Sequence, residues 1–122
     1  MESKKFSILS FKYAFDGLVS AVKEEPNLKF HFLTALLVLI FSFFLHIDKT
    51  DLIIVILLIG FVITVELTNT AIESVVDHFT QKDHPGAKLA KDISAGAVLI
   101  AAVTASIIGL IIFLPYITSW II

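Results

Sequence analysis

The first part of the chain, residues 1–25, alternates apolar and charged positions at helical spacing. Phe11 and Phe15 fall on one side of such a helix, and Lys12 and Lys23 fall on the other. A helix with one apolar face and one basic face is suited to lying flat at the headgroups of a membrane. The alternative is an ordinary helix that packs on a partner. Because a membrane segment follows at once, we expect the surface helix.

Three long segments follow, over residues 27–46, 52–79 and 92–114, and each contains a long apolar run. The apolar run of the last segment, which ends at Leu114, is long enough to cross a bilayer. The middle one has only 14 apolar residues, LIIVILLIGFVITV, so its helix must continue through the polar stretch VELTNTAIESVVD. The pattern predicts a single all-α membrane domain with one surface helix and three transmembrane helices.

The polar stretch places its acidic residues on one side of the helix. At about 100° per residue, Glu66, Asn69, Glu73 and Asp77 fall within an arc of about 80°. We call these four residues the polar stripe. Carboxylates at this spacing repel one another unless a cation lies between them. Mg²⁺ prefers oxygen ligands, commonly one or two carboxylates plus the phosphates of a substrate. The stripe therefore favours a metal–phosphate site.

Composition and charge narrow the class of protein. With 57% hydrophobic residues and a mean hydropathy of +0.95, a chain of 122 residues is too apolar for a small soluble domain. No cysteine is present, which excludes disulfides and thiolate metal sites, and a net charge of −2 gives no reason to expect nucleic acid. Glycine-rich nucleotide motifs are absent.

The distribution of lysine predicts the orientation. Eight of the nine lysines precede the first membrane helix or lie between the second and third, and only Lys49 occupies the other loop. The positive-inside rule then places the N-terminus, the end of the polar stripe and the loop over residues 77–92 in the cytoplasm. Glu25 lies at the same depth and can add a ligand from another helix. The cations Lys82, His84 and Lys91 are available to phosphates.

The residues alone leave other interpretations open. An acidic stripe beyond a membrane helix is often only the solvated face of that helix. Acidic residues inside a membrane also mark proton or ion paths. Asn69 can also have a purely structural role, in which its side chain forms a hydrogen bond between two helices. A lone histidine such as His31 is more often hydrogen-bonded or interfacial than a ligand.

The stretch VELTNTAIESVVD followed by HPGAKLAKDISAGAVLIAA resembles the signature of the bacterial diacylglycerol kinase/undecaprenol kinase family. The resemblance covers about residues 11–114, and SFKYAFDGLVSAVKEEPNLKFH is more similar to the undecaprenol kinase branch. It implies a homotrimer in the bacterial inner membrane, with active sites shared between protomers. The implied reaction transfers the γ-phosphoryl group of MgATP to a lipid alcohol, undecaprenol or alternatively diacylglycerol. The alternative of another class is a small channel or assembly protein.

The resemblance also implies roles for single residues. Glu66 would be the general base, supported by Asn69, and Glu25 with Glu73 would hold the divalent metal. The family pattern can include an arginine near the N-terminus; here Phe6 stands near that place, beside Lys4 and Lys5. The residues implied to contact ATP are Tyr13, Asp77, Lys82, His84, Lys91 and Asp92.

Overall fold

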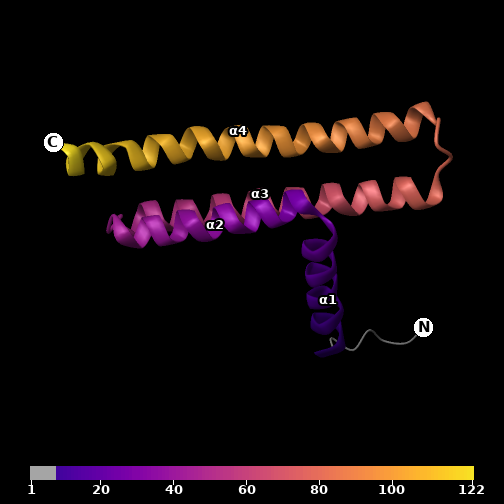
Figure 1. Cartoon of the computed structure of the whole chain (residues 1–122), viewed down its shortest axis with the longest axis horizontal. Coiled ribbons are helices and arrows are strands. Elements are labelled where there is room, and N and C mark those ends of the chain that lie inside the picture. Colours follow the sequence, from indigo (N-terminus) through magenta and orange to yellow (C-terminus); the bar gives the residue numbers. More distant parts are fainter. Residues whose placement is uncertain (1–7) are drawn as a thin grey trace.

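The computed structural model describes residues 8–122 and forms four helices there (Figure 1). By length and composition, α2 (Pro26–Phe44), α3 (Lys49–Phe79) and α4 (Pro85–Ile121) are each able to cross a membrane. The predicted fold class, an N-terminal helix followed by three membrane-spanning helices, is confirmed. Lys4, Lys5 and Phe6, which were considered in place of the family arginine, lie outside the described residues. The helices are α1 (Ile8–Glu24), α2 (Pro26–Phe44), α3 (Lys49–Phe79) and α4 (Pro85–Ile121).

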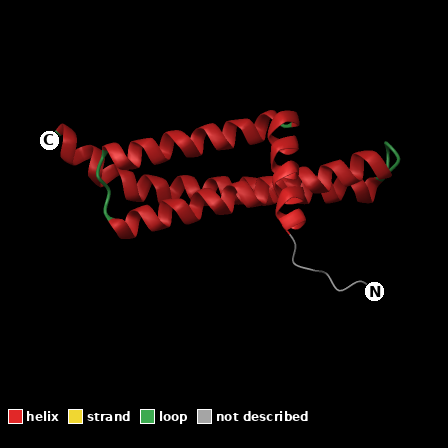
Figure 2. Ribbon diagram, turned by 90° about the horizontal axis from the view of Figure 1, so that it is seen from below, coloured by secondary structure: helices red, strands yellow, loops and turns green. Residues whose placement is uncertain are grey.

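The three long helices run side by side, and α1 stands across them (Figures 1 and 2). The closest packing is between α3 and α4, and α2 packs on α3. In Figure 1 the last turns of α3 and the first turns of α4 extend beyond the level at which α1 meets α2. If α1 marks a membrane surface, this α3–α4 end projects out of the apolar layer, as the polarity of its sequence requires.

Short local signals start the helices. Glu25 has an extended backbone with φ −109° and ψ 108°, as expected for a residue before proline, and Pro26 then opens α2. His46 adopts a left-handed conformation with φ 54°, which reverses the chain after α2. The Asp48 side chain accepts a hydrogen bond of 2.9 Å from the backbone N–H of Asp51 and so caps α3.

The fourth helix is longer at both ends than the predicted span of 92–114. It begins at Pro85, where His84 Nδ1 accepts a hydrogen bond of 3.1 Å from the N–H of Ala87. The expected loop over 77–92 is therefore much shorter, and Lys91 lies on the helix. At the other end α4 continues through Pro115 to Ile121. Membrane helices tolerate proline because neighbouring groups and local adjustment satisfy the freed carbonyl.

Few side chains are buried within the protomer, and most apolar side chains of the long helices are exposed. Between α2 and α4, over α3, lies an open apolar groove of about 980 Å³, which we call the α2–α4 groove. His31 and Thr34 line it near the start of α2, and Phe44 lines it near the end of that helix. The buried apolar residues are Leu28, Leu45, Val55, Ala101 and Ile112.

Candidate active site

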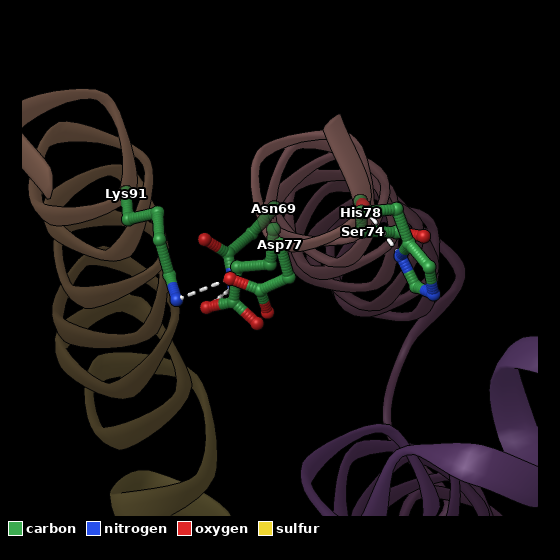
Figure 3. A network of polar contacts seen from close by, with 6 residues as sticks. Asn69, Ser74, Asp77, His78 and Lys91 are labelled. Atoms are coloured by element: carbon green, nitrogen blue, oxygen red, sulfur yellow. Dashed lines mark hydrogen bonds and ion pairs between the residues drawn. The ribbon is translucent and has the colours of Figure 1, made fainter. Parts of the chain in front are cut away.

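The polar stripe becomes steadily more exposed along α3. Glu66 and Asn69 are buried, with 3% and 8% of their surface exposed, Glu73 is half-buried and Asp77 is exposed. In Figure 3, Asn69 and Asp77 point from α3 toward α4, whereas His78 lies on the other side of α3. The stripe thus runs from a buried carboxylate to one open to water.

Two hydrogen bonds join α4 to the stripe through Asn69. Ser94 Oγ donates to Asn69 Oδ1 at 2.7 Å, and Asn69 Nδ2 donates to Glu73 Oε1 at 3.2 Å. The Glu73 carboxylate only accepts hydrogen bonds, so the Asn69 amide N–H faces Glu73 and the amide oxygen is left to accept from the buried Ser94. The sequence analysis implied that Asn69 supports Glu66, but among residues 8–122 its hydrogen bonds go to Glu73 and Ser94. The analysis missed Ser94, because a serine in a helix of small residues has no distinctive pattern.

Glu66 has one histidine and two carboxylates around it. Its Oε2 lies 3.7 Å from His31 Nε2 on α2, and only 4% of its side chain is exposed. Glu25, at the junction of α1 and α2, and Glu73 are both close enough to interact electrostatically with Glu66. The structure therefore brings the expected acidic residues of α3 and the α1–α2 junction near one buried position. His31 was not among the expected site residues, because a lone histidine is rarely a specific signal.

Lysines and aspartates pair at the start of α4. Lys91 Nζ donates to Asp77 Oδ1 at 2.8 Å, which links α4 to the exposed part of the stripe (Figure 3). Lys88 Nζ donates to Asp92 Oδ2 at 2.6 Å within α4. Lys91 thus contacts the stripe, while Asp92 pairs with Lys88 within α4.

Three expected nucleotide residues lie apart from these contacts. Tyr13 is on α1 with 69% of its surface exposed, Lys82 is exposed in the loop, and His84 caps α4. Among residues 8–122, no hydrogen bond or ion pair joins them to the stripe. Within the same range, no three histidine or acidic side chains gather closely enough to hold a metal ion by themselves. A metal at Glu25 and Glu73 therefore needs ligands from a substrate or a second protomer.

Comparison with known proteins identifies the family. The family model for prokaryotic diacylglycerol kinase matches residues 12–113. The chain belongs to the prokaryotic diacylglycerol kinase family. It is 47% identical over 106 residues to the undecaprenol kinase of Bacillus subtilis, covering 87% of this chain and 86% of that protein.

Two diacylglycerol kinases are also similar to this chain. The identity is 39% over 113 residues with the enzyme of Synechocystis sp., covering 92% of this chain and 65% of that protein. It is 33% over 95 residues with the enzyme of Escherichia coli (strain K12), covering 78% of each. The prediction of an ATP-using lipid kinase with several membrane-spanning helices is confirmed for this family member. None of these three relatives is a channel or an assembly protein.

Proposed function

We propose that this chain transfers the γ-phosphoryl group of MgATP to the hydroxyl of undecaprenol, giving undecaprenyl phosphate. The observation that carries the reaction is the buried Glu66 carboxylate at the start of a stripe that opens to water near Asp77. An apolar acceptor reaches the buried end and a charged nucleotide reaches the open end. The choice of acceptor is supported by sequence identity, which is 47% with the undecaprenol kinase of Bacillus subtilis and 39% with the diacylglycerol kinase of Synechocystis sp.. Diacylglycerol is the second candidate.

In this proposal Glu66 is the general base. Its carboxylate takes the proton of the lipid hydroxyl while the hydroxyl oxygen bonds to the γ-phosphorus and the bond to ADP breaks. Glu66 lies in the helix that crosses the apolar layer, near the level of the α1–α2 junction where Glu25 is found. A lipid hydroxyl at headgroup depth meets a carboxylate at this level. Phosphoryl transfer depends mainly on such positioning and on charge neutralisation.

The acidic residues around Glu66 fit a hard divalent ion. Glu25 and Glu73 would hold Mg²⁺, and the phosphates of ATP would complete its ligand set, since magnesium sites commonly use one or two carboxylates plus phosphates. The ion supplies neutralisation of phosphate charge when it is bound. Asn69, held by Ser94, keeps one Glu73 oxygen in a fixed direction. That fixed direction supports Glu73 as a ligand.

The open end of the stripe would bind the nucleotide. The Lys91 side chain is 38% exposed and its ammonium already pairs with Asp77 of the stripe, so it can exchange Asp77 for a phosphate. Asp77 and Asp92 would order the nucleotide beside it. Tyr13, Lys82 and His84 would join this pocket from α1 and from the loop that begins α4. Within the described part of one protomer, these three residues make no hydrogen bond or ion pair with the stripe. A nucleotide pocket that includes them would therefore be formed between two protomers.

The assembly would be a homotrimer in the bacterial inner membrane with its N-terminus and active sites on the cytoplasmic side. A Cβ built at Gly96 or at Gly109 meets nothing within 4 Å, so neither glycine is needed for packing inside the protomer. Small residues of this kind allow another helix to approach closely. The large exposed apolar area of α2 and α4 is consistent with further helix contacts.

The test is a phosphotransfer assay with the full chain in mixed micelles, with radiolabelled MgATP and either undecaprenol or diacylglycerol at equal surface concentration. We expect faster transfer to undecaprenol. A clear preference for diacylglycerol would change the acceptor but keep the lipid kinase. No transfer to either lipid would overturn the proposed function.

A further inference from the structure

We propose that His31 is a positioning residue of the phosphotransfer site, which holds the Glu66 carboxylate where the α2–α4 groove meets the polar stripe. The inference rests on the proposed function, because it takes Glu66 as the base. The sequence pattern did not identify His31 as a site residue. The structure identifies it, because its side chain on α2 contacts Glu66 on α3.

The position of His31 links two parts of the molecule. Its imidazole lines the α2–α4 groove and keeps 19% of its surface exposed, while its Nε2 lies 3.7 Å from Glu66 Oε2. The Phe30 ring lies edge-on to the imidazole, with centroids 5.9 Å apart. His31 is therefore the polar side chain through which the apolar groove adjoins the buried carboxylate.

The charges around Glu66 require such a partner. A buried carboxylate is costly unless it is paired, and Glu25 and Glu73 add like charge nearby. Among residues 8–122, His31 is the one side chain that forms an ion pair or hydrogen bond with Glu66. Without it, we expect the Glu66 carboxylate to rotate away from this position, and that change removes the base from the lipid hydroxyl.

The distance suits positioning rather than proton capture. At 3.7 Å the contact is longer than a hydrogen bond, so the imidazole attracts the carboxylate without occupying its lone pairs. Those lone pairs stay available to the hydroxyl proton of the acceptor. Such contacts commonly shorten when a substrate binds. The expected signature is a loss in kcat with little change in the binding of ATP.

The experiment compares three variants of the full chain in micelles: His31→Leu, His31→Gln and Thr34→Val. Gln keeps a polar N–H near the position of Nε2, whereas Leu removes it. Thr34 also lines the groove, one turn further along α2, but has no hydrogen bond or ion pair with Glu66 among the described residues. For each variant we would measure kcat, the KM for ATP, the thermal midpoint and the oligomeric state.

We expect His31→Leu to lower kcat by about 10- to 100-fold, the usual effect of losing one partner of a charged group. The KM for ATP should stay within about twofold, because a group that acts only on the base does not bind the nucleotide. His31→Gln should recover most of the lost kcat, and Thr34→Val should match the wild type.

Two results would overturn the positioning role. One is a normal kcat in His31→Leu while Glu66→Gln is inactive, which leaves the proposed function standing. The other is an equal loss in His31→Leu and His31→Gln accompanied by a lower thermal midpoint or a broken oligomer, which assigns His31 to structure. If the wild type phosphorylates no lipid, the proposed function fails first and the inference fails with it.

Discussion

The two ends of the helical bundle both carry acidic residues, but they use them differently. At the α2–α3 end, Asp48 caps α3 and its N–H donates to the Tyr116 hydroxyl at 3.0 Å. That hydroxyl donates to Asp51 Oδ2 at 2.6 Å. These contacts tie the loop between α2 and α3 to the C-terminal part of α4. Each aspartate there has a clear structural partner.

Toward the α3–α4 end, acidic side chains lie close to one buried carboxylate. Glu66 interacts electrostatically with Glu25 and with Glu73, and His31 Nε2 lies 3.7 Å from Glu66 Oε2. Like charges in a buried position lower stability, and under the proposed function the metal and phosphates bound there would offset this cost. The two ends differ in how far their carboxylates are paired within the chain, rather than in the number of carboxylates.

The largest expected effect is that of Glu66→Gln. The amide cannot accept the lipid proton, so kcat should fall by about 10²–10⁴-fold, the usual contribution of a general base. Thermal midpoint, oligomeric state and binding of an ATP analogue should be unchanged. The matched control is Asp51→Asn at the other end, which should keep its kcat. Equal losses of activity in the two variants would erase the distinction between the ends.

Lys91→Met tests the open end of the stripe. We expect the KM for ATP to rise by about 10- to 100-fold, as for the loss of a hydrogen bond to a charged group. Steady-state kinetics over a range of MgATP concentrations would measure it. Stability should change little, because the pair with Asp77 is exposed to water. An unchanged KM would remove Lys91 from the nucleotide site.

Tyr116→Phe tests the structural end. The variant loses the bond to Asp51 and the bond from the Asp48 N–H, so the thermal midpoint should fall by a few degrees. The kcat should stay as in the wild type. Ser119→Ala is the control, because among residues 8–122 the hydrogen bond of Ser119 Oγ goes to the Tyr116 carbonyl of its own helix. A loss of kcat in Tyr116→Phe without a loss of stability would connect the two ends.

The sequence predicted the helices and the polar stripe because both depend on regular spacing. It predicted the ends of α4 poorly. The predicted segment ended at residue 114, just before Pro115, yet α4 continues past this proline, and the helix begins at Pro85 because His84 supplies a cap. Proline stops a helix or sits within one according to its neighbours, and spacing alone does not reveal which.

Two residues that reach the stripe from other helices, His31 and Ser94, were not predicted as site residues. His31 and Ser94 belong to different helices from Glu66 and Asn69, and each contact depends on how two helices pack. No periodic pattern records such a pairing. The family resemblance implied that Asn69 supports Glu66, whereas the hydrogen bonds of its amide in the structure reach Glu73 and Ser94.

The smallest effect is expected for Lys88→Met. Lys88 pairs with Asp92 one turn along α4, and the two side chains are 78% and 60% exposed, so water screens the pair and stability should change by less than about 0.5 kcal/mol. Lys88 and Lys91 are both paired lysines of α4, but only Lys91 reaches α3. Kinetics at low MgATP should therefore show a KM near the wild-type value for Lys88→Met. An increase equal to that of Lys91→Met would mean that the nucleotide responds to the total charge of this end, and that the contact of Lys91 with the stripe has no special role.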